Sequence, residues 1–158
     1  MNLPKIDVAT VSSQATTNYP QQFRSVVQGR SRQRLGNAAG LTQFGVNICR
    51  LAPGAASSLR HWHMSEDEFV YMLEGEVVLV EDEGETTLKP GDAAAWKAGS
   101  TVGHHLVNRG TRDAVFLEVG TRAARDRVEY PDVDLLLEKD EAGVRRLHKN
   151  GEAYTDGT

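Results

Sequence analysis

The stretch His61-Trp62-His63-Met64-Ser65-Glu66-Asp67-Glu68 places two histidines two residues apart and follows them directly with an acidic cluster. Side chains on a β-strand alternate between its two faces, so on a strand His61 and His63 would share one face. Two imidazoles on one face with a carboxylate nearby are typical of a metal site and unusual in an apolar core. We therefore expect a metal site here, with the rest of the chain arranged around it.

Short strand-like segments surround this stretch. Glycine-marked turns separate them at intervals of about ten residues, which is typical of an antiparallel sandwich or a small barrel. Glu74-Gly75 is a tight hairpin signal between two of them. The segments expected to be strands are 42–51, 59–63, 68–73, 76–80, 86–88, 93–96, 104–107 and 114–119.

Some of these strands are apolar on both faces, notably 69–73 and 77–80. One face can fill the interior of a barrel, because alternate side chains point inward. The other face must be covered by a second sheet, by the terminal arms or by another subunit.

The two ends of the chain have a different composition from its centre. Residues 1–40 form an N-terminal arm whose first 18 residues are polar and loosely held, followed by one or two helical turns at 21–27. Residues 121–158 form a charged C-terminal arm. We expect one domain, 1–158, with a core barrel at about 41–120 and short helical or irregular arms.

Composition excludes several partner classes. The net charge is −4, so the sequence does not predict a basic surface that would bind nucleic acid. The basic runs 30–34 and 122–127 are interpreted as solvated faces. The one cysteine, Cys49, lies in an apolar strand and is expected to be a buried, inert thiol. The sequence shows no signal peptide and no apolar run approaching ~18 residues, so we expect a cytoplasmic protein without membrane contact.

Three further histidines follow the opening stretch: His104, His105 and His148. The first two are adjacent, so on a strand they point to opposite faces and only one can join His61 and His63. With Glu68 this gives three imidazoles and one carboxylate, a set that suits Fe(II), Mn(II), Ni(II), Co(II) or Zn(II). His148 is interpreted as a surface residue.

These residues resemble the two sequence motifs of the cupin superfamily. The first motif is matched by Gly54, His61, His63, Glu68 and Gly75, with a leading spacer of six residues where five are commonly found. The resemblance spans about 41–120, and the whole chain is similar to small single-domain bacterial cupins, some of them described as sugar-phosphate isomerases.

The second motif is matched by Gly91, Gly99, His104 and Asn108. Lys97 stands where the motif has a proline, and four residues rather than two separate Gly99 from the histidine. The spacing from His104 to Asn108 is intact.

The resemblance implies a double-stranded β-helix, or jelly roll, with a metal ion inside and commonly a homodimer. It favours His104 as the fourth ligand beside His61, His63 and Glu68, with His105 as its replacement.

The acidic cluster offers more than one candidate carboxylate. Asp67 competes with Glu68, since a spacer of three residues also fits the motif, but Glu68 has the right distance to Gly75. Glu66 and Asp67 are otherwise interpreted as solvated, and Trp96 as a packing residue.

Two functions remain open at this point. The first is a metalloenzyme that acts on a small polar or oxygenated metabolite, isomerase-like or dioxygenase-like, with one divalent Zn, Fe, Mn, Ni or Co ion per chain. The second is a non-catalytic cupin that binds or senses a small ligand. Beyond the metal ligands, the sequence indicates no catalytic residue.

Overall fold

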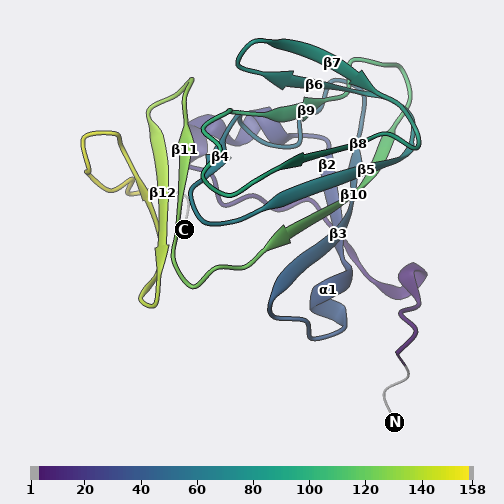
Figure 1. Ribbon diagram of the computed structural model, residues 1–158, viewed down its shortest axis with the longest axis horizontal. Coiled ribbons are helices and arrows are strands. Elements are labelled where there is room, and N and C mark those ends of the chain that lie inside the picture. The colour runs from purple at the N-terminus through teal and green to yellow at the C-terminus, as the bar shows by residue number, and fades with distance from the viewer. Residues whose placement is uncertain (1–3, 157–158) are drawn as a thin grey trace.

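The structure is a computed structural model that describes residues 4–156 and consists mainly of β-strands (Figure 1). Its helices are two short 3₁₀ segments, Val8–Thr10 and Gln21–Val27, and the α-helix α1 (Leu35–Ala38). Within residues 4–156, no helix has the length and apolar character needed to cross a membrane. The strands are β1 (Ser13–Gln14), β2 (Arg30–Arg34), β3 (Phe44–Leu51), β4 (Trp62–His63), β5 (Glu68–Glu74), β6 (Val77–Glu81), β7 (Gly84–Leu88), β8 (Ala93–Trp96), β9 (His105–Val107), β10 (Ala114–Thr121), β11 (Asp126–Tyr130), β12 (Leu135–Asp140) and β13 (Gly143–Leu147).

The strands form three antiparallel sheets. The largest has six strands in the order β1-β2-β3-β10-β5-β8. A three-stranded sheet, β7-β6-β9, faces it across the main core, and the third sheet has the order β13-β12-β11-β4 (Figure 1). The predicted all-β fold is confirmed, and the hairpin predicted at Glu74-Gly75 joins β5 to β6.

The main core is the space between the six-stranded and three-stranded sheets. Alternation along β5 shows how it is filled, because Val70 and Met72 are buried whereas Phe69 and Tyr71 are exposed. Cys49 is fully buried there, and burial raises the pKa of its thiol to about 12, so the predicted inert thiol is confirmed. The core residues are Cys49, Leu51, Ala55, Val70, Met72, Val77, Leu79, Leu88, Trp96, Leu106, Ala114 and Phe116.

The two arms are more regular than the sequence predicts. β1 and β2 of the N-terminal arm extend the largest sheet beyond β3, and β11 of the C-terminal arm pairs with β4. A second apolar cluster joins the arms to each other, and it consists of Tyr19, Val27, Leu59, Val128, Tyr130 and Leu135. The expectation of irregular arms is therefore replaced by strands whose partners lie far away in the sequence. The helical turns expected at 21–27 are confirmed, and residues 1–3 lie outside the described residues.

The strand expected at 59–63 is shorter than predicted. Only Trp62 and His63 form a regular strand, while His61 makes an isolated antiparallel bridge with His104. This bridge uses both backbone hydrogen bonds between the two residues, at 3.1 and 3.0 Å. It fixes two of the predicted ligands directly opposite each other.

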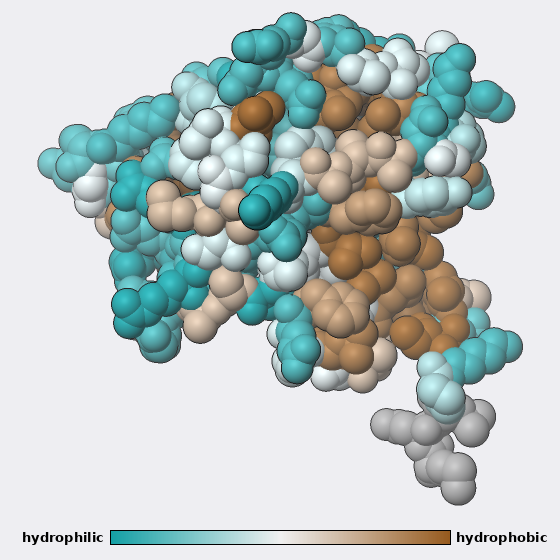
Figure 2. Space-filling model, viewed as in Figure 1, coloured by the Kyte–Doolittle hydropathy of each residue, from teal (hydrophilic) through white to brown (hydrophobic). Residues whose placement is uncertain are grey.

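The outer face of the six-stranded sheet is apolar and exposed. Phe69, Tyr71 and Leu73 on β5 are 39%, 40% and 42% exposed. Their partners on β10, Leu117 and Val119, extend the same face. Figure 2 shows the resulting hydrophobic surface over β3, β5 and β10. Neither the arms nor another sheet covers this face within the described chain.

A substitution at Gly75 tests how tightly the β5–β6 hairpin packs against its neighbours. The φ of +68° at Gly75 is left-handed, and an added Cβ would lie 2.5 Å from the backbone oxygen of Asp113. Gly91 is a matched control, since its φ is +93° but its Cβ would meet nothing within 4 Å. We expect Gly91→Ala to cost about 1 kcal/mol through backbone strain alone. Gly75→Ala should cost about 3 kcal/mol, because overpacking adds to the strain. Urea unfolding measures both, and equal losses would contradict the packing argument.

Candidate metal centre

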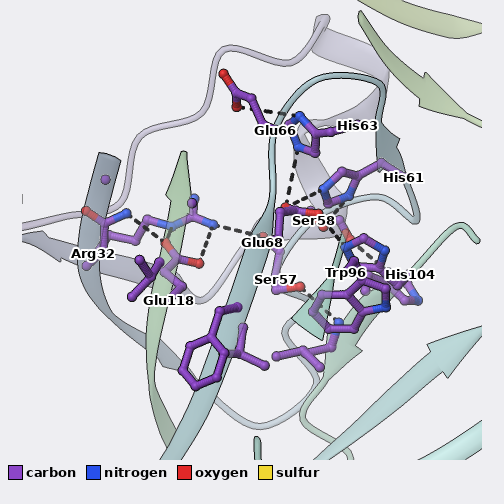
Figure 3. Close-up of a pocket in the computed structure, with 18 of the residues that line it drawn as sticks. Arg32, Ser57, Ser58, His61, His63, Glu66, Glu68, Trp96, His104 and Glu118 are labelled. Carbon is purple, nitrogen blue, oxygen red and sulfur yellow. Dashed lines mark hydrogen bonds and ion pairs between the residues drawn. The ribbon is translucent and has the colours of Figure 1, made fainter. Parts of the chain in front are cut away.

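Residues from three separate segments meet at the carboxylate of Glu68, which lies at the start of β5 (Figure 3). The Nε2 atom of His104 lies 2.6 Å from Glu68 Oε2, and that of His61 lies 3.1 Å from Oε1. His63 Nε2 lies 3.4 Å from Oε1. One ligand atom from each of His61, Glu68 and His104 falls within 4.8 Å of the others. The four residues predicted as ligands are thus brought together.

The outer nitrogen of each imidazole faces an oxygen. His61 Nδ1 lies 2.9 Å from the carbonyl oxygen of Leu59, and His104 Nδ1 lies 3.1 Å from that of Val102. A carbonyl oxygen can only accept, so these contacts assign the proton of each neutral ring to Nδ1. The Nε2 lone pairs are then directed at Glu68. This is the orientation that metal-ligating histidines adopt.

The third imidazole is oriented by a carboxylate. His63 Nδ1 lies 2.6 Å from Oδ2 of Asp126, whose side chain is 2% exposed. The other oxygen of Asp126 accepts the backbone N–H of Ser65 at 2.9 Å. A carboxylate, a histidine and a metal position in series form a recurrent arrangement that fixes the ring and raises its basicity.

Charges in the cluster are strongly coupled. Burial alone would lower the pKa of His63, but hydrogen bonds to Asp126 and Glu68 raise it to about 10. Burial alone would raise the pKa of Glu68, but contacts with the three imidazoles hold it well below its usual range. The cluster therefore needs positive charge at its centre, supplied either by protons or by a cation. Three Nε2 lone pairs and an ionised carboxylate fit a divalent transition metal ion.

Packing also holds the imidazole of His104 in place. The ring of His104 stacks on Trp96 with 3.8 Å between centroids and 3° between planes. Trp96 is itself fixed, since its Nε1 donates to Glu81 at 2.9 Å. Trp96 is a packing residue, as expected, but its packing partner is a candidate ligand.

The competing candidates point elsewhere. His105 directs Nδ1 to the carbonyl oxygen of Ser58 at 2.8 Å rather than toward Glu68. Asp67 accepts the backbone N–H of Ala98 at 2.7 Å. His148 is paired with Asp134 at 2.8 Å, remote from the cluster.

Glu66 is not solvated, contrary to the interpretation of the acidic cluster from the sequence. Its side chain is 14% exposed, pairs with Lys139 and lies 3.6 Å from His63 Nδ1. With His63 and Asp126 it forms a second group of potential ligand atoms. The charge run hid it, because two of the three adjacent acidic residues, Glu66 and Glu68, turn inward and only Asp67 is exposed.

Asp126 is a candidate site residue that the sequence motifs do not include. It interrupts the basic run 122–127, and it shares one face of β11 with Val128 and Tyr130, all three of them buried. An aspartate that alternates with two apolar residues on the same face of one strand is the signal that could have identified it.

The cluster lies in the wall of a cavity of about 560 Å³. Residues 16–19 of the N-terminal arm line one side without filling it. Four arginines also line the cavity, and they are Arg30, Arg32, Arg34 and Arg122. The interpretation of run 30–34 as a solvated face is therefore wrong for its three arginines, because alternation on β2 turns them inward.

Comparison with known proteins identifies the family. The cupin domain family model matches residues 47–120. One similar protein is a sugar phosphate isomerase of the cupin superfamily from Silicibacter pomeroyi, whose crystal structure is known. Its sequence is 44% identical to this chain, and its structure superposes with a TM-score of 0.92. The match covers 98% of this chain and 100% of the isomerase chain. The chain belongs to the cupin superfamily. The jelly roll implied by the sequence motifs is thereby confirmed.

Two other solved structures are more distant. A proposed sugar phosphate isomerase from Acidithiobacillus ferrooxidans is 28% identical, with coverages of 79% of this chain and 80% of its own and a TM-score of 0.73. The polyketide cyclase RemF from Streptomyces resistomycificus is 22% identical and has a TM-score of 0.62. The match covers 76% of this chain and 80% of the RemF chain, and at this identity it supports only the similarity of the fold. No curated protein matches this cupin.

Asp126→Asn tests the orienting role of this carboxylate. The variant keeps the volume but has one oxygen for two donors, His63 Nδ1–H and Ser65 N–H. We expect Zn²⁺ affinity to fall about 10–100-fold, as is typical when such a partner is lost. Competition with a chromogenic chelator measures the affinity. Asp134→Asn, which alters the exposed pair with His148, should leave it unchanged. Equal affinities for wild type and Asp126→Asn would show that the contact is only structural.

Proposed function

We propose that this cupin is a metal-dependent isomerase of small sugar phosphates, with one divalent ion held by His61, His63, Glu68 and His104. The observation that carries the proposal is the convergence of three oriented Nε2 atoms and one carboxylate on the wall of an open cavity. The 44% identical relative, which covers this chain almost completely, supports the choice of reaction.

A bound Zn, Fe, Mn, Ni or Co ion would supply Lewis acidity to polarise a substrate carbonyl. The residues of the chain supply the substrate cavity and the ligands that hold the ion. The cavity of about 560 Å³ is of the size that small-molecule sites have. The ligand Glu68 accepts contacts from all three imidazoles, so it is not free to carry a proton.

An aldose–ketose isomerisation also moves a proton between adjacent carbons, which requires a base near the metal. Glu118 is the cavity carboxylate best placed for this role. It lies on β10 opposite Val70, so it is the diagonal neighbour of Glu68 at about 7–8 Å. Arg32 and Asn47 hold its carboxylate in place, with Asn47 donating to Oε1 at 3.0 Å. We propose Glu118 as the proton carrier.

The proposal is tested by metal content and turnover together. Wild type, purified without added metal, should contain about one divalent ion per chain and interconvert aldose and ketose phosphates with solvent deuterium incorporation, followed by NMR. His61→Ala should lose both the ion and the activity. Glu118→Gln should keep the ion but lose at least ~100-fold in turnover, as expected for removal of a general base.

His148→Ala is the control, because it removes a histidine outside the cluster and should change neither quantity. Equal metal content in wild type and His61→Ala would show that the proposed ion site is wrong. A metal-loaded wild type without turnover or deuterium exchange on any aldose or ketose phosphate would reject the isomerase and favour a binding or sensing role.

We also propose that the exposed outer face of the six-stranded sheet pairs with a second copy of the chain. Phe69, Tyr71 and Leu73 give this face exposed apolar side chains along β5, within the hydrophobic surface of Figure 2. Exposed patches of this kind mark interaction sites, and an apolar patch can pair with itself about a two-fold axis.

Tyr71→Lys places a charge within this face, between β10 and β8. We expect wild type to elute as a homodimer and Tyr71→Lys as a monomer in size-exclusion chromatography with light scattering, because a buried unpaired charge is strongly unfavourable. Val144→Lys alters an exposed apolar residue on β13 and should remain dimeric. A monomeric wild type, or a dimeric Tyr71→Lys, would contradict the assignment of this face.

A further inference from the structure

The wall of the cavity away from the metal centre is rich in arginine. Arg30, Arg32 and Arg34 occupy alternate positions on β2 and face Leu51, Cys49 and Asn47 on β3. These β3 residues point into the barrel, so the three arginines do too. Arg122 follows the end of β10 and lines the same cavity.

Two of the four arginines are already engaged. Arg32 forms an ion pair with Glu118. Arg30 is 8% exposed and donates to the carbonyl oxygens of Ser57 at 2.7 Å and Thr16 at 3.1 Å.

The other two keep their charge uncompensated. Arg34 donates from Nε to Gln14 at 3.3 Å, and Arg122 donates to the carbonyl oxygen of Leu41 at 3.1 Å and to Asn37. Within residues 4–156, neither forms an ion pair with a carboxylate. Each guanidinium has five N–H donors, so several remain for a ligand.

Both charges lie at the same corner of the cavity. Gly45 and Asn47 are successive inward positions on β3, and Arg34 is the register partner of Asn47. The guanidinium of Arg122 lies over Gly45, 3.5 Å from where a Cβ would be. Arg34 and Arg122 are therefore neighbours.

The floor between this corner and the metal centre has no side chains. Gly45 pairs with Gly120 on β10, and Gly120 pairs with Glu68 on β5. Two strand spacings separate Gly45 from Glu68, which is about 10 Å. A small molecule can lie along this glycine floor with one end at each site.

We propose that Arg34 and Arg122 bind the phosphate group of a substrate whose carbonyl end lies at the metal centre. The inference rests on the proposed function and narrows it to substrates with a terminal phosphate several bonds from the reacting carbons. Two guanidinium groups offer the planar, multiple N–H donors that suit the oxygens of a phosphate dianion. Arg30, which donates only to carbonyl oxygens, adds positive charge along the same wall, whereas the charge of Arg32 is balanced by Glu118.

Binding measurements separate this inference from catalysis. Isothermal titration calorimetry would compare D-ribose 5-phosphate, D-ribose and inorganic phosphate on wild type, Arg34→Gln, Arg122→Gln and the double variant. We expect wild type to prefer D-ribose 5-phosphate to D-ribose by at least ~10-fold, and each single variant to weaken D-ribose 5-phosphate and inorganic phosphate about 10-fold. Arg125→Gln is the matched control, because Arg125 is exposed, pairs with Glu141 and does not line the cavity.

Each result bears on the proposal. Wild-type binding of both phosphate probes in the double variant would overturn it, as would equal binding of D-ribose and D-ribose 5-phosphate by wild type. Equal loss of D-ribose and D-ribose 5-phosphate in the variants would also overturn it, since that pattern reports a distorted cavity. Arginine-dependent phosphate binding in a protein without isomerase activity would support the phosphate site and reject the proposed reaction.

Discussion

The carboxylate of Glu68 faces three imidazole nitrogens, and the rest of the structure is arranged to keep them there. Lone pairs directed at a carboxylate repel it unless a cation or protons lie between them. Such an array persists only if a contact at Nδ1 fixes the orientation of each imidazole ring. Carbonyl oxygens hold His61 and His104, and Asp126 holds His63. The backbone bridge between His61 and His104 then fixes the spacing of two of the rings.

This requirement explains why the terminal arms are folded onto the barrel. The residue that orients His63 is on β11, a strand of the C-terminal arm, and the cavity wall opposite the metal centre is β2 of the N-terminal arm. Both arms are tied together by the apolar cluster around Tyr19 and Tyr130, whose rings meet edge to face at 5.9 Å. The barrel alone would present the ligands, but without the carboxylate behind His63 and without the arginine wall.

The sequence predicts what is local and misses what depends on distant pairing. His61, His63 and Glu68 lie within eight residues, so alternation and spacing suffice to group them. His104 follows from a motif with its own fixed spacing to Asn108. Asp126 does not, because its partner His63 is 63 residues away. The strand face that Asp126 shares with Val128 and Tyr130 indicates that it is buried but does not identify that partner. The C-terminal strands were missed for the same reason, since their register is set by β4 and by one another.

The arginines of β2 show why a charge run cannot be assigned from composition alone. Run 30–34 alternates arginine with serine or glutamine, a period of two that places all three charges on one face of any strand. Whether that face meets water or a cavity depends on the neighbour, and here the neighbour is β3, whose inward residues line the barrel. A metal centre of this kind supports many reactions, so it constrains the substrate little. The opposite wall constrains it more, because uncompensated arginines above a floor of glycine select for charge and length in whatever reaches the metal centre.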